Sequence, residues 1–166
     1  MQAALPCGPN SAQTPRCALA QSRVMLGSMH NSSEWWTVHI DGSALPNPGR
    51  MSIGGIAHAP DGGHHTFQQA LPGTGCNNEA EARAAIYALQ WLQQLGARQV
   101  LLHTDNSILA EQLSQPAPKR IERLCQLYDS ARQLLAGFDA VRVQWIPRHK
   151  NTVADALARV DVSSGG

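Results

Sequence analysis

The hydrophobic pattern of this chain changes its period near residue 75, and that change constrains the fold more than any other feature. Before it, three apolar runs are separated by short turns rich in Gly, Pro, Asn and Asp, a pattern typical of antiparallel strands. These runs cover residues 35–42, 51–59 and 64–71. After it, apolar side chains recur at helical spacing over residues 78–95, and Gly96 stands where such a helix would end.

Strand-like and helical patterns alternate in the second half of the chain. Two strands are expected at residues 99–104 and 141–146, and three helices at residues 106–113, 119–136 and 152–159. Gly54 and Gly55 lie inside a strand pattern, which indicates a β-bulge or a close backbone approach. The complete order, β-β-β-α-β-α-α-β-α, predicts an α/β protein with a mixed sheet and helices on both faces.

The first 33 residues differ in composition from the rest, because Ala, Ser, Gln and Pro dominate and no acidic residue occurs before Glu34. We expect a disordered tail over residues 1–33, one domain over residues 34–161 and a flexible end at residues 162–166. Arg16 and Arg23 without acidic neighbours also fit a transit peptide, so organellar targeting stays open beside a cytoplasmic location.

The composition excludes several classes of protein. A formal net charge of +1 gives no sign of a strongly basic nucleic-acid binder. The cysteines form no C-x-x-C pair, which favours a reducing compartment; they are Cys7, Cys17, Cys76 and Cys125. No apolar run approaches the roughly 20 residues that span a membrane. We therefore expect a cytoplasmic, soluble monomer without a membrane partner.

Four isolated carboxylates stand at the boundaries of the predicted elements. Asp41 and Asp105 each follow an apolar strand run, Glu81 lies near the start of the long helix, and Asp155 lies early in the last helix. Strand ends and helix starts meet at the carboxyl edge of an open α/β sheet, where ligands bind. Two carboxylates about 4 Å apart repel by roughly 4 kcal/mol at an effective dielectric near 20. The pattern therefore predicts a divalent-cation site at this edge.

Three of these acids also have purely structural interpretations. Asn78 and Glu81 have the spacing of a capping box, in which Glu81 would serve only its own helix. Asp105 could cap the helix that follows it. Asp155 could be a favourable charge in the first turn of its helix. Asp41 has the weakest structural interpretation, because an acid directly after an apolar strand gains little from folding.

Taken together, four short motifs in this order resemble the ribonuclease H type 1 family, over about three quarters of the chain. They are Asp41-Gly42-Ser43 with Asn47-Pro48-Gly49, Asn77-Asn78-Glu79-Ala80-Glu81, Thr104-Asp105-Asn106, and Pro147-Arg148-His149-Lys150-Asn151 with Ala154-Asp155-Ala156-Leu157-Ala158. The resemblance implies a three-layer α/β/α fold. Its five-stranded sheet would have three antiparallel strands and two strands parallel to the first.

The resemblance also implies an endonuclease that cuts the RNA strand of RNA–DNA hybrids with two Mg²⁺ ions, Mn²⁺ being the alternative metal. Hard Mg²⁺ prefers oxygen ligands, and a two-metal site activates water and stabilises the leaving oxygen. The expected ligands, which are also the catalytic acids, are Asp41, Glu81, Asp105 and Asp155. In this family a histidine in the 147–151 loop assists turnover, which points to His149 as a further catalytic residue, although a solvated loop histidine fits equally.

Hybrid recognition is expected to rest on 2′-hydroxyls and minor-groove edges rather than on base sequence. Gly42 and Ser43 would face RNA sugars, and positively charged Arg148 and Lys150 would meet phosphates. The complete set of expected substrate contacts is Gly42, Ser43, Asn47, Asn77, Asn78, Arg148, Lys150 and Asn151. Ordinary turn chemistry explains the Asn and Gly residues equally well.

The chain resembles the compact subgroup of the family, which lacks a basic protrusion, because residues 114–119 run directly into one predicted helix. Several alternatives stay open. A nuclease of the same fold could act on double-stranded RNA, or could serve a reverse transcriptase. A non-catalytic hybrid-binding module is a third possibility, but the presence of all four acids argues against it.

Overall fold

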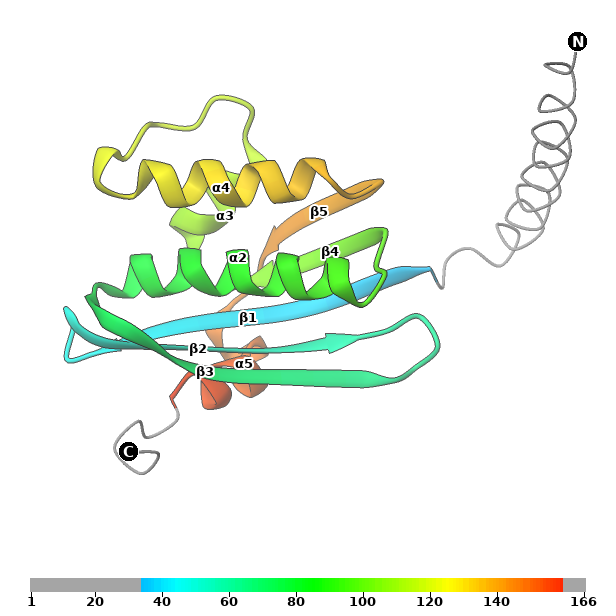
Figure 1. The fold of residues 1–166 in the computed structure, drawn as a ribbon, viewed down its shortest axis with the longest axis horizontal. Coiled ribbons are helices and arrows are strands. Elements are labelled where there is room, and N and C mark those ends of the chain that lie inside the picture. Colours follow the sequence, from blue (N-terminus) through cyan, green and yellow to red (C-terminus); the bar gives the residue numbers. More distant parts are fainter. Residues whose placement is uncertain (1–33, 160–166) are drawn as a thin grey trace, which may run out of the picture. The chain divides into compact units, whose positions relative to one another are not determined.

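The computed structural model describes residues 34–159, and the predicted tail (1–33), the last residues of the predicted domain and the flexible end (162–166) lie outside this range. The elements follow the predicted order (Figure 1). They are β1 (Trp35–Leu45), β2 (Gly49–His58), β3 (His64–Gly75), α2 (Asn77–Gln94), β4 (Gln99–Thr104), α3 (Ser107–Ser114), the 3₁₀ turn η2 (Glu122–Leu124), α4 (Cys125–Ala136), β5 (Ala140–Trp145), the 3₁₀ turn η3 (Arg148–Lys150) and α5 (Thr152–Ala158).

The strands form one five-stranded sheet in the order β3-β2-β1-β4-β5. The pairs β1–β2 and β2–β3 are antiparallel, whereas β1–β4 and β4–β5 are parallel. This is the predicted mixed sheet, and the fold prediction is confirmed. The parallel pairing of β1 with β4 ends at Ile40 opposite Thr104, while β1 continues to pair with β2 as far as Leu45. Beyond Ile40, none of the described strands lies beside that edge of β1.

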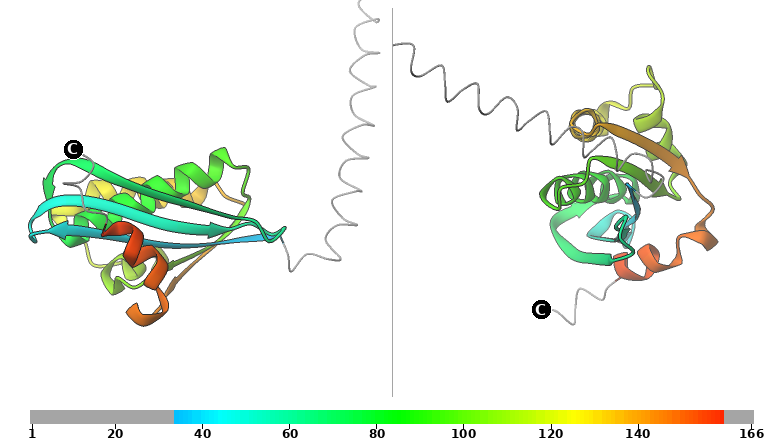
Figure 2. Two further views of the ribbon diagram at one scale, coloured as in Figure 1. Left: turned by 90° about the horizontal axis from the view of Figure 1, so that it is seen from below. Right: turned by 90° about the vertical axis from the view of Figure 1, so that its right-hand side faces the viewer.

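The main core lies between the sheet and α2, and α4 packs against α2 (Figure 2, right view). The inward face of α2 is mostly alanine, and its buried side chains include Ala80, Ala84, Ala88, Leu89 and Leu92. Small side chains allow the helix backbone to approach the sheet closely. Each fully buried Leu or Val contributes about 1.5–3 kcal/mol of transfer free energy, so this layer holds α2 firmly on β1.

The opposite face of the sheet is covered by α5, which packs on β1, β2 and β3 (Figure 2). A Cβ atom on Gly54 would lie 2.5 Å from the backbone nitrogen of Ala158, so only glycine permits this contact. The hydroxyl of Ser52 donates a hydrogen bond to the Ala158 carbonyl. Of the two predictions for Gly54 and Gly55, the close approach is confirmed; the strand irregularity lies instead between Arg50 and Ser52.

Two local predictions were wrong. The helix predicted over residues 119–136 begins only at Cys125, because Ile121 is extended (φ −112°, ψ 99°) and Gln112 Nε2 donates to the Lys119 carbonyl at 2.6 Å. A side-chain hydrogen bond from the preceding helix, seven residues away, thus overrides the local apolar spacing. The first and third strands also extend past their predicted ends at residues 42 and 71.

The connection between α3 and α4 decides the subgroup. Within the described residues it contains one 3₁₀ turn and no inserted helix, as expected of the compact subgroup. None of the helices described is long and apolar enough to cross a membrane.

Candidate metal centre

Asp41, Glu81 and Asp105 converge at the point where β4 ends beside β1. Asp41 is the first residue of β1 beyond the parallel pairing with β4, and Asp105 directly follows β4. Glu81 comes from the second turn of α2, which packs on β1. One carboxylate oxygen from each of the three lies within 4.8 Å of the others. The sequence prediction that these acids meet at a sheet edge therefore agrees with the geometry.

Gly42 allows Glu81 to approach Asp41. A Cβ atom on Gly42 would overlap the backbone carbonyl of Ala80 and would lie 2.5 Å from the backbone nitrogen of Glu81. Any other residue would push α2 away from β1. The closest approach between the helix and the sheet thus occurs beside the acidic cluster.

Burial disfavours the charged forms of the Asp41 and Glu81 carboxyls. Asp41 and Glu81 are each 5% exposed, and Glu81 Oε2 is buried with no hydrogen-bond partner among residues 34–159. Burial, followed by the neighbouring Asp105 and Asp155 charges, raises the pKa of Asp41 to about 6. Burial and Asp41 raise the pKa of Glu81 well above its ordinary value. A bound divalent cation would stabilise the charged carboxylates, since it supplies a neighbouring positive charge.

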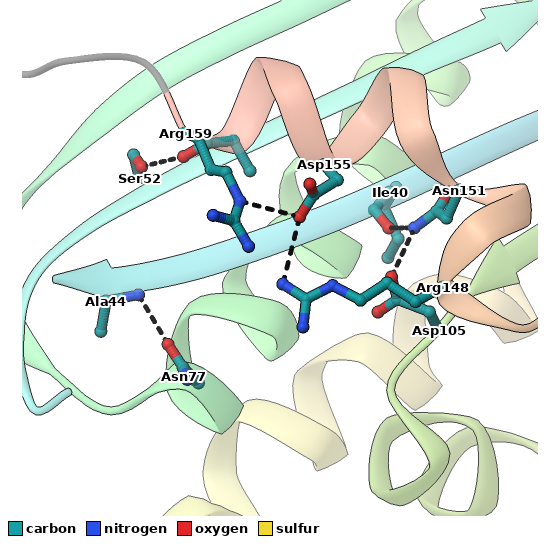
Figure 3. Close-up of polar contacts among 10 residues, drawn as sticks. Ile40, Ala44, Ser52, Asn77, Asp105, Arg148, Asn151, Asp155 and Arg159 are labelled. Carbon is teal, nitrogen blue, oxygen red and sulfur yellow. Dashed lines mark hydrogen bonds and ion pairs between the residues drawn. The ribbon is translucent and has the colours of Figure 1, made fainter.

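Asp155 reaches the same cavity from the opposite side, on α5. Its Oδ1 accepts from Arg159 Nε at 3.1 Å and from Arg148 Nη2 at 3.4 Å (Figure 3). Burial acts to raise its pKa, but Asp41, Arg159 and Arg148 together hold it below its ordinary value. Asp155 therefore stays charged in the metal-free protein.

A cavity of about 390 Å³ joins these groups. It is lined by all four acids together with Gly42, Ser43, Asn47, Asn77, Asn78 and Arg148 from the predicted substrate contacts, and by Asn106 and Arg159. The carboxylate-only donor set suits a hard cation such as Mg²⁺ or Mn²⁺ better than a soft one. With the orphaned Glu81 oxygen, it fits a divalent-cation centre.

The capping interpretations of Glu81 and Asp105 were wrong. The N-cap of α2 is Cys76, whose sulfur accepts from the Glu79 N–H at 3.4 Å. The N-cap of α3 is Asn106, whose Oδ1 accepts from the Leu109 N–H at 2.8 Å. Both acids are therefore left for the cluster. Asp155 does lie in the first turn of α5, so its favourable interaction with the helix dipole coexists with its place in the cavity.

The asparagines of the cavity use their side-chain oxygens within the protein. Asn77 Oδ1 accepts from the Ala44 N–H at 2.8 Å, and Asn47 Oδ1 accepts from the Asn77 N–H at 3.0 Å. Asn78 Oδ1 accepts from Asn106 Nδ2 at 2.9 Å. Within residues 34–159, the NH₂ groups of Asn47, Asn77 and Asn78 donate no hydrogen bond. The NH₂ groups of these three residues are thus available as donors to a ligand in the cavity.

The other predicted contacts lie outside this cavity. His149 and Lys150 are exposed on the 3₁₀ turn η3 and do not line it. Asn151 is 1% exposed, and its Nδ2 donates to the Ile40 carbonyl at 2.9 Å and to Asp105 Oδ2 at 3.3 Å. Asn151 therefore positions Asp105, and its contact with substrate stays a prediction, as do those of His149 and Lys150.

Two cavity residues were missed at the sequence level. Arg159 stands four residues after Asp155, a spacing that favours an ion pair on a helix. Asn106 follows Asp105 and occupies a recognisable N-cap position. Both signals were present in the sequence, but each is also common on ordinary helices.

A sheet in the order 3-2-1-4-5, with acids gathered where β1 and β4 separate, defines a ribonuclease H-like protein. Residues 39–160 match the family described as reverse transcriptase-like. The bifunctional protein Rv2228c of Mycobacterium tuberculosis is 33% identical over 125 residues, covering 73% of this chain and 34% of that protein. Ribonuclease HI of Halobacterium salinarum is 32% identical over 120 residues, covering 72% of this chain and 60% of that protein.

Comparison with solved structures gives the same fold family. RNase H1 from Halobacterium salinarum has a TM-score of 0.72 at 30% identity, covering 78% of this chain and 98% of that one. LC11-RNase H1 in complex with an RNA/DNA hybrid has a TM-score of 0.70 at 24% identity, covering 78% and 98%, and shares the fold. The chain belongs to the ribonuclease H-like family described as reverse transcriptase-like, and it is similar to ribonucleases HI.

Proposed function

We propose that this protein is a metal-dependent endonuclease that hydrolyses the RNA strand of RNA–DNA hybrids, with residues 34–161 as its catalytic domain. The observation that carries the proposal is the buried cluster of Asp41, Glu81 and Asp105, whose carboxylate oxygens lie within 4.8 Å of one another. Two buried acids with raised pKa values are costly to the fold, and a cation site explains why they are there.

The four carboxylates would hold two Mg²⁺ ions, and Asp41 is the central ligand of the set, because it neighbours Glu81, Asp105 and Asp155. Such ions, when bound, lower the pKa of water and neutralise charge on a phosphodiester. Asp41 and Glu81 must release their protons to act as ligands, so cation binding and deprotonation are linked. Asn151 keeps Asp105 oriented through its 3.3 Å hydrogen bond. Glu79 pairs with Arg83 and takes no part.

The uncommitted NH₂ groups of Asn47, Asn77 and Asn78 support a nucleic-acid duplex as the substrate. Minor-groove base edges present mainly acceptors, and a 2′-hydroxyl accepts as well as donates. Amide NH₂ groups therefore match the wide minor groove of a helix that contains RNA. Gly42 and Ser43 line the same cavity and would approach the sugars, while Arg148 would bind a backbone phosphate.

His149 would act from outside the cavity. Its imidazole could move a proton to or from the leaving 3′ oxygen, or could help the cleaved strand to depart. Lys150 beside it would add a phosphate contact. Both are exposed on η3, so neither needs the core to change when substrate binds.

The test is cleavage of three labelled substrates by the full chain: an RNA–DNA hybrid, double-stranded RNA and single-stranded RNA. Each is incubated with Mg²⁺, with Mn²⁺ and with a chelator. We expect cleavage of the RNA strand of the hybrid with either metal and none with the chelator. Cleavage of double-stranded RNA in preference to the hybrid would assign the other nuclease class, and metal-dependent binding without any cleavage would indicate a hybrid-binding module.

A further inference from the structure

Arg159 and Arg148 donate hydrogen bonds to the same oxygen of Asp155 from two different elements. Arg159 lies one turn after Asp155 at the end of α5, and Arg148 lies in η3 (Figure 3). Both arginines line the acidic cavity. One carboxylate oxygen therefore carries two guanidinium contacts, at 3.1 Å and 3.4 Å.

Arg159 keeps part of its binding capacity unused. It reaches Asp155 through Nε, and within the described residues its two terminal nitrogens make no hydrogen bond. A guanidinium presents a planar set of five donors that suits a phosphate as well as a carboxylate. The Arg159 side chain is 52% exposed and Asp155 is 24% exposed, so solvent screens this pair and the two can separate.

A divalent cation would compete with Arg159 for Asp155. The oxygen that the arginines hold belongs to one of the four acids of the cavity, and a cation bound there would be repelled by a guanidinium about 3 Å from the same carboxylate. Once Asp155 turned to the cation, Arg159 would lose its partner beside a cavity that accepts a phosphodiester.

We propose that Arg159 alternates between two anions: Asp155 in the metal-free protein, and a backbone phosphate of the nucleic acid once a cation occupies the cavity. This inference rests on the proposed function and deepens it. Arg159 should then have effects of opposite sign, because it weakens cation binding when nucleic acid is absent and strengthens nucleic-acid binding when the cation is present.

A matched control exists on α2. Arg83 and Glu79 form an ion pair of the same i, i+4 spacing at 3.0 Å, and neither lines the cavity. If Arg159 only stabilised its helix, its substitution would leave the Ca²⁺ and hybrid affinities unchanged, as is expected for Arg83. Only a residue that exchanges partners would change the two affinities in opposite directions.

The experiment uses Ca²⁺ as the probe, since it occupies oxygen sites without supporting cleavage. Ca²⁺ affinity without nucleic acid is measured by calorimetry, and the affinity for a short labelled RNA–DNA hybrid in saturating Ca²⁺ is measured against salt concentration. The variants are Arg159→Gln, Arg159→Lys, Arg83→Gln and Asp41→Asn, each with its melting temperature recorded.

For Arg159→Gln we expect Ca²⁺ to bind more tightly by roughly 2- to 10-fold, and the log–log salt slope of hybrid binding to fall by about 0.9, the value of one phosphate contact. Arg159→Lys should keep the slope with part of the affinity, because it keeps the charge but loses the fork. Arg83→Gln should change neither quantity.

Weaker Ca²⁺ binding by Arg159→Gln would overturn the inference, because it would make the residue a support for Asp155. An unchanged salt slope would also overturn it. Calcium binding that Asp41→Asn leaves unaltered would instead overturn the proposed function, and this inference with it.

Discussion

The two sides of the acidic cavity hold their carboxylates in different ways. On the side of β1 and α2, Asp41 and Glu81 are each 5% exposed, and the structure pairs neither with a cationic side chain within residues 34–159. On the side of α5, Asp155 is partly exposed and pairs with two arginines. The buried pair is held by backbone packing around Gly42, whereas the exposed acid is held by side chains that can change partners.

Because of this difference, the two sides of the cavity should tolerate amino-acid substitutions to different degrees. The buried side cannot lower its electrostatic cost except by taking up protons or a cation. The exposed side can exchange one counter-charge for another. We therefore expect changes on the buried side to abolish activity or disturb the fold, and changes on the exposed side to adjust binding and turnover.

The largest effect is expected for Asp41→Asn. The amide keeps the size of the side chain but removes a charge that the proposed cation site needs, so hybrid cleavage should fall by more than the roughly 10²–10³-fold that follows loss of a single transition-state donor. The metal-free fold should gain about 1–3 kcal/mol at pH 7, because a buried carboxylate is no longer ionised there.

Cleavage rates and denaturant unfolding without metal measure both consequences. The control is Asp61→Asn, which changes an acid in the exposed β2–β3 hairpin. Near-normal cleavage by correctly folded Asp41→Asn would contradict the metal-centre assignment.

Gly42→Ala should have the next largest effect. The new methyl group would overlap the Ala80 carbonyl, so α2 must move away from β1 and take Glu81 with it. Overpacking of this kind costs about 1–3 kcal/mol, and a displacement of about 1 Å at a reacting site can cost 10²-fold in rate. Gly63→Ala is the control, since a methyl group there meets only the flexible Asp61 side chain. Equal stability of the two variants would show that the helix–sheet contact is not tight.

The pH dependence of stability should distinguish the buried side without any cleavage assay. The pKa of Asp41 rises from 3.8 to about 6 on folding, so the folded protein binds more protons between these values. The free energy of unfolding should therefore fall as the pH rises through this window, by up to about 3 kcal/mol. His39 acts in the opposite direction, because burial, with His103 and His58, lowers its pKa from 6.5 to about 4.

Comparison of the wild type with Asp41→Asn cancels the contribution of His39. The unfolding free energy of the metal-free wild type, minus that of metal-free Asp41→Asn, should become more negative from pH 4 to pH 6. With saturating Mg²⁺ the trend should reverse, because cation binding requires the deprotonated ligands. If the difference in unfolding free energy does not vary with pH, burial does not raise the pKa of the Asp41 carboxyl.

The same contrast explains how much the sequence could predict. The order of elements and the meeting of Asp41, Glu81 and Asp105 follow from local patterns, because strand ends and helix starts share one edge of an α/β sheet. The helix start at Cys125 could not be predicted, since it depends on a hydrogen bond from the Gln112 side chain in α3 to the Lys119 carbonyl, which apolar spacing does not reveal. The apolar spacing of residues 119–124 is equally compatible with a helix.

Side-chain pairing on the exposed side was also beyond local patterns. Nothing in the sequence indicates that Asn151 would be buried and would hold Asp105, or that Arg148 would reach Asp155 rather than solvent. Such contacts depend on where η3 lies over the end of β1. Glu79, in contrast, follows a local rule: residues two apart do not share a helix face, and Glu79 pairs with Arg83 instead of joining Glu81 in the cluster.

The smallest effect is expected for His149→Ala. This side chain is exposed on η3 and does not line the cavity, so it lacks the fixed geometry of a general acid that contributes 10²–10⁴-fold. We expect a decrease of roughly 3- to 10-fold in multiple-turnover cleavage of the hybrid, because an exposed imidazole can still move a proton or assist departure of the cut strand.

Single-turnover cleavage, with enzyme in excess over hybrid, separates these two roles. If His149 assists product departure, the His149→Ala variant should match the wild type in a single turnover and be slow only in repeated turnovers. A proton-transfer role would slow both equally. His64→Ala, at an exposed position in the β2–β3 hairpin, is the control and should leave both rates unchanged. Asp41→Asn is expected to abolish single-turnover cleavage. If His149→Ala leaves single-turnover cleavage unchanged and slows only repeated turnover, the buried side of the cavity carries the chemical step and the exposed side affects product release.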